Sequence, residues 1–267
     1  MSKNERITSS QIRPYYEATG KEEEVFKLCH SSKLPMLLKG PTGCGKSRFV
    51  DAMAFDLGIP LITVACNEDT SATDLLGRFL IKGNDTVWQD GPLTRAVKMG
   101  AILYLDEVVE AREDVIVLIH SLTDYRRSLF IDAIGESIVA PPSFQMVLSY
   151  NPGYQRSFKE LKASTRQRFV ALTFGYPSAS VETKIVITES KAPEKLCEKL
   201  VALANKIRSL SELGLSESVS TRLIVNAALL AQGGLNPRLA ADVAIAQSLS
   251  DEPESNRALR DLAALYL

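Results

Sequence analysis

The run from Gly40 to Ser47 combines glycines, a lysine and a hydroxyl side chain, a set suited to holding phosphate groups. It consists of Gly40, Pro41, Thr42, Gly43, Cys44, Gly45, Lys46 and Ser47. Its glycines let backbone N–H groups close around phosphate oxygens, Lys46 would neutralise the β- and γ-phosphates, and the Ser47 hydroxyl would bind Mg²⁺. A short apolar run precedes the loop and a helical pattern follows it, which is the context that this motif requires. The run therefore predicts a site for ATP and Mg²⁺.

Two acidic residues follow a second apolar run. Residues 101–105 predict a buried strand, and Asp106 and Glu107 come directly after it. They are expected beside the phosphate loop, because the carboxyl ends of parallel strands share one edge of a sheet. Asp106 would hold Mg²⁺, directly or through water, and Glu107 would polarise an attacking water. Alone, such a pair also fits a solvated strand end, but after a phosphate loop it favours hydrolysis.

Four further polar residues are candidates for the same site. Asn151 follows an apolar run and could position the water, although an ordinary Asn-Pro-Gly turn is the simpler alternative. Arg166 and Arg168 precede another apolar run and could reach the γ-phosphate of a neighbouring subunit, or else form surface ion pairs. Arg222 lies at a predicted helix start and could meet the γ-phosphate, or simply follow an N-cap.

Apolar runs alternate with helical patterns through the first part of the chain. Strands are expected over 34–39, 61–65, 101–105, 144–150 and 169–174, and helices over 47–57 and 113–122. This alternation predicts an α/β fold with a parallel five-stranded sheet and helices on both faces. Two candidate hairpins, 77–91 and 126–140, interrupt the pattern.

After residue 176 strand formers become rare. Helical periodicity covers 181–189, 193–210, 220–232 and 236–249, which predicts a smaller all-helical domain. The expected organisation is a polar N-terminal arm over 1–20, an α/β nucleotide-binding domain over 21–176 and a helical domain over 177–267.

The composition argues against several classes of protein. The 267 residues are 45% hydrophobic and 24% charged, values that argue against a disordered or fibrous chain. With 31 Lys+Arg against 32 Asp+Glu the net charge is -1, so no overall positive field favours nucleic acid. No apolar run approaches the length of a membrane helix, so no membrane insertion is expected. Four cysteines without a Cys-x-x-Cys pair fit a reducing, cytoplasmic location.

The motifs together resemble the AAA+ ATPases, specifically the MoxR branch. Within that branch the chain looks like the CbbQ/NorQ/NirQ group, and the resemblance runs from about Pro14 to the C-terminus. The longest runs that carry it are Leu38–Lys46, Thr86–Ala96, Leu105–Arg112 and Ser164–Val170.

This resemblance implies an α/β AAA+ domain with a helical lid, assembled as a homo-hexameric ring with ATP between subunits. It implies the following roles: Walker B acids for Asp106 and Glu107, sensor 1 for Asn151, sensor 2 for Arg222, and the arginine finger for Arg168, with Arg166 in reserve. The 77–91 segment corresponds to the family's helix-2 insert, and the 126–140 hairpin to its pre-sensor-1 insert.

The resemblance also implies partners. The family works with an adaptor that has a von Willebrand factor A domain, and the two remodel a target enzyme. We expect rubisco as the target, activated by release of inhibitory sugar phosphates, with nitric oxide reductase as the alternative. A passive nucleotide-dependent scaffold is a further alternative, which Glu107 argues against. The two hairpin inserts argue against a small-molecule P-loop kinase.

Overall fold

The computed structural model describes residues 5–8, 12–152, 161–210 and 218–267. The chain forms two compact units. One, the sheet unit, comprises Met1–Gly40 and Lys46–Thr173; the other, the helical unit, comprises Pro41–Gly45 and Phe174–Leu267.

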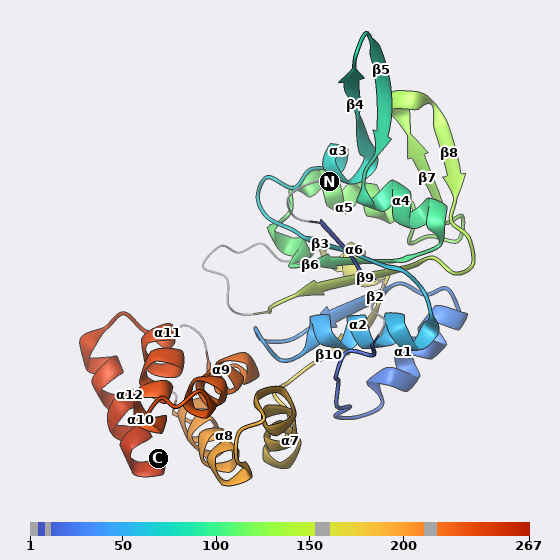
Figure 1. The fold of residues 1–267 in the computed structure, drawn as a ribbon. Coiled ribbons are helices and arrows are strands. Elements are labelled where there is room, and N and C mark those ends of the chain that lie inside the picture. The colour runs from blue at the N-terminus through green and yellow to red at the C-terminus, as the bar shows by residue number, and fades with distance from the viewer. Residues whose placement is uncertain (1–4, 9–11, 153–160, 211–217) are drawn as a thin grey trace. The chain divides into compact units, whose positions relative to one another are not determined.

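The sheet unit is built on a six-stranded sheet in the order β1-β3-β6-β9-β2-β10 (Figure 1). Its strands are β1 Glu5–Thr8, β2 Met36–Lys39, β3 Leu61–Ala65, β6 Ile102–Asp106, β9 Gln145–Tyr150 and β10 Val170–Thr173. All pairings from β3 to β10 are parallel, so the expected five-stranded parallel sheet is confirmed. The sixth strand, β1, pairs antiparallel with β3. It was not predicted, because main-chain pairing at a sheet edge needs no apolar pattern.

Helices cover both faces of this sheet. They are α1 Glu22–Ser31, α2 Lys46–Leu57, α3 Ala72–Leu76, α4 Pro92–Met99, α5 Glu113–His120 and α6 Ala163–Arg166. Helices α1 and α2 lie on one face, whereas α3, α4 and α5 lie on the other (Figure 1). Phe26 of α1 and Phe49 of α2 are fully buried and meet edge to face, with ring centroids 5.4 Å apart.

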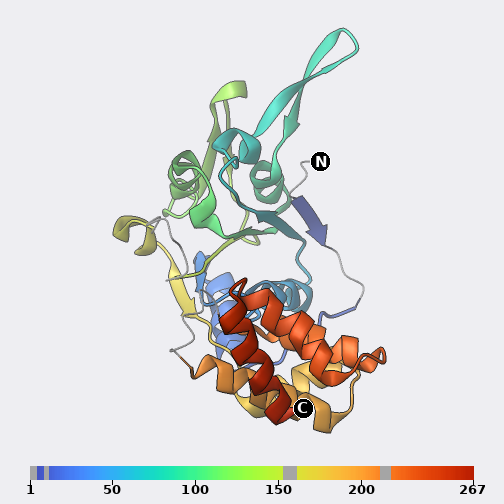
Figure 2. The ribbon, with the colours of Figure 1, turned by 90° about the vertical axis from the view of Figure 1, so that its left-hand side faces the viewer.

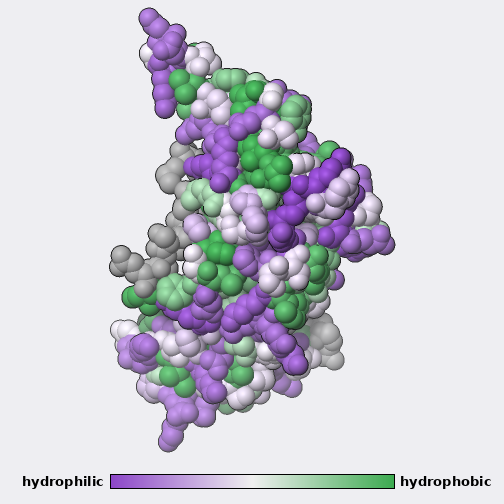
Figure 3. Space-filling view, turned by 90° about the vertical axis from the view of Figure 1, so that its right-hand side faces the viewer, coloured by the Kyte–Doolittle hydropathy of each residue, from purple (hydrophilic) through white to green (hydrophobic). Residues whose placement is uncertain are grey.

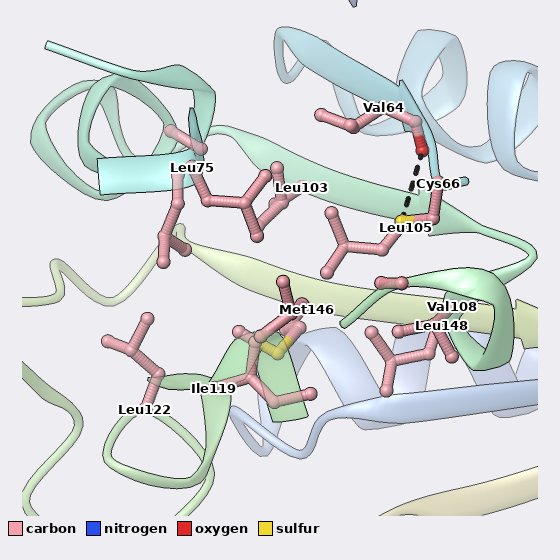
Figure 4. Close-up of a cluster of buried hydrophobic side chains, with 14 of the residues drawn as sticks. Val64, Cys66, Leu75, Leu103, Leu105, Val108, Ile119, Leu122, Met146 and Leu148 are labelled. Atoms are coloured by element: carbon pink, nitrogen blue, oxygen red, sulfur yellow. Dashed lines mark hydrogen bonds between the residues drawn. The ribbon is translucent and has the colours of Figure 1, made fainter. Parts of the chain in front are cut away.

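The alternation of side chains along β6 divides its residues between these two faces. Leu103 and Leu105 pack into the core under α3, α4 and α5, together with Ile119 of α5 (Figure 4). Because successive strand residues point to opposite faces, Tyr104 and Asp106 are directed towards the face that carries α2. This division lets one strand build both the core and a polar site.

Both expected hairpins are present. They are formed by β4 Gly77–Lys82 with β5 Asp85–Asp90, and by β7 Ser128–Ile131 with β8 Glu136–Val139. They project from the same end of the sheet unit (Figures 1 and 2). Lys98 of α4 links them, since its Nζ lies 2.9 Å from Asp90 and 3.6 Å from Glu136. The tip of the β4–β5 hairpin is hydrophilic, with hydrophobic residues just below it (Figure 3).

The helical unit has its own apolar core. Its helices are α7 Ala179–Ser190, α8 Glu194–Arg208, α9 Thr221–Gln232, α10 Pro237–Ala241, α11 Gln247–Leu249 and α12 Pro253–Tyr266. The single helix expected over 236–249 was wrong in detail, because a π-helical turn, Asp242–Ala246, separates α10 from α11. Five helices of the two units, α1, α3, α4, α6 and α12, were not predicted. Among the described residues, no helix has the length and apolar character needed to cross a membrane.

Candidate active site

The predicted phosphate loop connects β2 to α2. Gly43 and Gly45 have φ angles of +68° and +101°, which L side chains rarely adopt, so glycine is required at both positions. Lys46 begins α2 and is buried, and its Nζ donates a hydrogen bond to the Gly40 carbonyl at 2.8 Å. The lysine is thereby folded back over the loop, at a helix start whose N–H groups favour anions.

A chain of hydrogen bonds joins Lys46 to Glu107 through Asn151. Lys46 Nζ donates to Asn151 Oδ1 at 2.6 Å, and Asn151 Nδ2 donates to Glu107 Oε1 at 2.7 Å. Asn151 directly follows β9, which lies between β2 and β6 in the sheet. The strand order therefore explains why these three residues meet, although they are distant in sequence.

Glu107 has an unusual backbone and an unusual electrostatic environment. Its φ of 54° and ψ of 46° are left-handed, a conformation that costs a non-glycine residue about 1–3 kcal/mol. The turn directs its N–H to Ser149 Oγ at 3.3 Å and its side chain to Asn151. Burial and the neighbouring charge of Asp106 raise the pKa of Glu107, against a lowering by Lys46. A raised carboxylate pKa suits a group that must accept a proton.

Asp106 lies beside Ser47. Ser47 Oγ donates to Asp106 Oδ2 at 3.3 Å, so a hydroxyl and a carboxylate oxygen stand together at the start of α2. Hard oxygen ligands of this kind are what Mg²⁺ prefers, and Mg²⁺ sites use few protein carboxylates. The donor set therefore fits a magnesium ion.

Two residues of this site were missed by the sequence analysis, Tyr104 and Ser149. Both hydroxyls donate to Asp106 Oδ1, that of Tyr104 at 2.7 Å. Burial and the charge of Asp106 raise the pKa of Tyr104 well above its usual value. The sequence did contain a pattern that could have identified them. Tyr104 lies two residues before Asp106, and Ser149 lies two residues before Asn151. That spacing places each polar pair on one face of an otherwise apolar strand.

The structure does not bring Arg166 and Arg168 to Lys46 of their own chain. Both are exposed, and they precede β10, whose first residue, Val170, pairs with Met36 at the start of β2. The phosphate loop leaves the other end of β2, so Val170, two residues after Arg168, lies roughly 13 Å from the start of the loop at about 3.3 Å per strand residue. Burial and the charge of Arg168 lower the pKa of His120, which places that arginine near α5.

Arg222 lies in the first turn of α9, within the helical unit. Ser220 caps this helix, and its Oγ accepts a hydrogen bond from the Leu223 N–H at 3.4 Å. A Cβ atom at Gly43 would lie 2.6 Å from Ser220 Cβ and 3.7 Å from Arg222 Cβ. Gly43 thus allows the close approach of α9 to the loop residues that belong to the same unit.

The remaining loop residues contribute backbone and packing. The Thr42 carbonyl accepts a hydrogen bond from the Tyr176 hydroxyl at 3.2 Å. Cys44 is buried between the loop glycines, and Pro41 follows Gly40.

Two family models match the chain. An AAA domain of the dynein-related subfamily matches residues 35–169, and the CbbQ/NirQ/NorQ C-terminal model matches residues 182–266. The first match covers the phosphate loop and the strands β2, β3, β6 and β9, and the second runs from within α7 to the end of α12.

Similar proteins match over nearly the full length. The denitrification regulatory protein NirQ of Pseudomonas aeruginosa is 55% identical, with coverage of 95% of this chain and 98% of the relative. Protein CbbQ of Hydrogenophilus thermoluteolus is 52% identical, covering 98% and 97%. Protein NorQ of Paracoccus denitrificans is 56% identical, covering 94% and 93%.

Solved structures share the fold at low sequence identity. A putative ATPase from Cytophaga hutchinsonii is 16% identical with a TM-score of 0.52, covering 94% of this chain and 90% of that one. A Thermotoga maritima RuvB mutant is also 16% identical, with a TM-score of 0.54 and coverage of 94% and 73%.

Proposed function

Since the chain belongs to the CbbQ/NirQ/NorQ family of AAA-domain ATPases, we propose that it is the ATP-driven motor of an enzyme-activating machine. The observation that carries this proposal is the hydrogen-bonded chain from Lys46 through Asn151 to Glu107. It joins a lysine suited to binding phosphate, a polar amide and a carboxylate whose pKa is raised. That set suits hydrolysis better than passive binding of a nucleotide.

In the proposed reaction, the loop 40–45 and Lys46 hold the phosphates of ATP. Glu107 accepts a proton from the attacking water. Asn151 fixes the positions of the Glu107 carboxylate and the Lys46 ammonium group through its two hydrogen bonds. A base positioned in this way contributes typically 10²–10⁴-fold to the rate. The left-handed turn at Glu107 aims the carboxylate at Asn151, so the strained backbone has a function at this position.

Ser47 and Asp106 are the residues that would hold Mg²⁺. A magnesium ion held there would help to neutralise the charge that develops on the phosphates. Ser47 would supply a hydroxyl and Asp106 a carboxylate oxygen, and these two oxygens lie 3.3 Å apart.

We propose that the active assembly is a homo-hexamer in which Arg168 of one subunit reaches the γ-phosphate held by its neighbour. The exposure of Arg168 and its place at the amino-terminal end of β10 support action between subunits. Arg166 is the reserve candidate, and Arg222 of α9 is proposed to sense the same phosphate. The proposed domains are the arm over 1–20, the nucleotide-binding domain over 21–176 and the lid over 177–267.

The proposed partners are a von Willebrand factor A domain adaptor and a target enzyme. Rubisco, freed of inhibitory sugar phosphates, is the first candidate target. Nitric oxide reductase is the second, and the similar identities of the CbbQ, NirQ and NorQ relatives support testing both. The motor itself is proposed to act in the cytoplasm.

The catalytic part is tested with purified protein. Glu107→Gln should bind ATP but turn it over about 10²-fold more slowly, because the amide cannot accept the proton. Glu113→Gln, the same change at an exposed residue of α5, should match wild type. Wild-type turnover by Glu107→Gln would remove the role given to Glu107.

The activator part is tested by reconstitution. The motor and its adaptor are mixed with rubisco that carries a sugar phosphate, and separately with inactive nitric oxide reductase, with and without ATP. ATP-dependent recovery of one enzyme identifies the target. Recovery of neither enzyme, with ATP turnover intact, contradicts activation of these targets but leaves the ATPase assignment in place.

A further inference from the structure

Three hydroxyl groups converge on the carboxylate of Asp106. Tyr104 and Ser149 both donate to Oδ1, and Ser47 donates to Oδ2 at 3.3 Å. Each hydroxyl carries one hydrogen, so all three hydrogens can be directed to the two oxygens of this one side chain. The carboxylate is thus held from one side by the strands β6 and β9, and it faces α2 with its other oxygen.

The two groups on Oδ1 are themselves fixed. Tyr104 is 1% exposed and Ser149 is fully buried, and their oxygens lie 3.0 Å apart. Ser149 Oγ also accepts the N–H of Glu107 at 3.3 Å, so its oxygen is anchored to the turn that follows β6. Neither residue can change rotamer without breaking these contacts in a packed environment.

The arrangement leaves the oxygens of Asp106 with different surroundings. Oδ1 is occupied by two donors from the sheet, whereas Oδ2 is directed to Ser47, the other oxygen ligand proposed for Mg²⁺. Without the Tyr104 and Ser149 hydroxyls, only the bond from Ser47 would, among the described residues, fix the orientation of this carboxylate at the strand end. A ligand pair that is set in advance loses less conformational entropy when the metal binds.

We propose that Tyr104 and Ser149 are positioning residues that hold Asp106 with Oδ2 towards Ser47, so that the two magnesium ligands are assembled before the metal and nucleotide bind. This inference rests on the magnesium site proposed above. Tyr104 and Ser149 touch neither metal nor nucleotide in this assignment. Ser149 acts through Asp106, whereas Tyr104 acts through Asp106 and also through Ser47, because its hydroxyl oxygen lies 3.3 Å from Ser47 Oγ.

The experiment measures binding of a fluorescent ADP analogue to the full chain, in EDTA and over a Mg²⁺ titration. Tyr104→Phe removes one hydroxyl and keeps the buried ring. We expect the Mg²⁺ concentration at half effect to rise about tenfold, the scale of one hydrogen bond to a charged group. Affinity in EDTA should stay within about twofold, since the phosphate loop is unchanged. Tyr125→Phe is the control, because Tyr125 is 92% exposed.

Ser149→Ala is a second, independent test. It should also raise the Mg²⁺ concentration at half effect. Thermal unfolding of each variant checks that it is folded; if Tyr104→Phe does not fold, Ser149→Ala carries the test. Wild-type Mg²⁺ dependence in the folded variants would overturn the inference while leaving the magnesium site intact. If the nucleotide affinity of the wild-type protein does not depend on Mg²⁺, both the magnesium site and the positioning role of Tyr104 and Ser149 are overturned.

Discussion

Asn151 is the residue whose replacement tests the site most directly, because it bonds both ends of the proposed machinery. Its amide accepts from Lys46 Nζ at 2.6 Å and donates to Glu107 Oε1 at 2.7 Å. Asn151→Leu has a similar volume and removes both bonds at once. We expect ATP turnover to fall strongly and ATP affinity to fall little.

The expected changes in kcat and in ATP affinity depend on the hydrogen bonds that Glu107 and Lys46 keep when Asn151 is replaced. A hydrogen bond to a charged group contributes about 1.5–3 kcal/mol, and about 1.4 kcal/mol corresponds to a factor of ten. The half-buried Glu107 loses the bond that orients it, so kcat should fall about 10- to 100-fold. Lys46 keeps its bond to the Gly40 carbonyl at 2.8 Å. Its phosphate-binding position is therefore largely preserved, and affinity should change less than about fivefold.

The assay is steady-state ATP hydrolysis together with equilibrium binding of a nucleotide analogue. Asn84→Leu, the same substitution at the exposed hairpin tip, is the control and should leave hydrolysis unchanged. A double-mutant cycle then asks whether Asn151 acts through Glu107. In a Glu107→Gln background, Asn151→Leu should lower kcat by less than about threefold, because the base is already absent.

Two results would refute this reasoning. If Asn151→Leu alone keeps kcat within threefold of wild type, the bridge seen between Lys46 and Glu107 has no catalytic role. If the full loss also appears in the Glu107→Gln background, Asn151 acts independently of Glu107, and a direct contact with water or phosphate must replace the bridging role.

Three further changes address other parts of the molecule. Arg168→Ala should bind ATP but hydrolyse it about 10³-fold more slowly, and mixing with Lys46→Ala subunits should restore activity, measured as turnover of mixed rings. No recovery in rings shown to be mixed would contradict action between subunits. Glu182→Ala should destabilise the helical unit by about 3 kcal/mol, measured by urea unfolding. Lys82→Glu with Asp85→Lys should leave basal ATPase intact and weaken adaptor-dependent stimulation; undiminished stimulation would make the β4–β5 hairpin purely structural.

The loss of stability expected for Glu182→Ala follows from the buried ion pair between Glu182 and Arg208. Glu182 is fully buried and accepts two bonds from Arg208, at 2.7 and 2.8 Å, and one from Thr221 at 2.6 Å. Arg208 keeps its bond to the Val219 carbonyl, which places the expected loss at the low end of the range for broken buried pairs. Asp242→Ala breaks a surface pair and should cost less than about 1 kcal/mol. Equal losses in the two variants would contradict this account.

The sequence alone was sufficient for the local parts of the site. The phosphate loop is set by glycines whose backbone angles depend on residue type and by the strand and helix that flank it. Asp106 and Glu107 could be placed at a sheet edge because they directly follow an apolar run. The two hairpins were likewise evident from short-range alternation and turn residues. The position of each part in the fold could be inferred from its own segment, whereas the role of Asp106 and Glu107 also required the phosphate loop earlier in the chain.

Only the tertiary structure decided which of these groups touch. The bond from Lys46 to Asn151 requires β9 to lie beside β2, and the contacts of Ser149 with Tyr104 and Asp106 require β9 to lie beside β6. The left-handed turn at Glu107 and the buried partner of Glu182 also had no local signal. Strand order, register and burial result from packing between segments far apart in the chain. Periodicity can assign a residue to a face, but it cannot identify the neighbour that completes its hydrogen bonds.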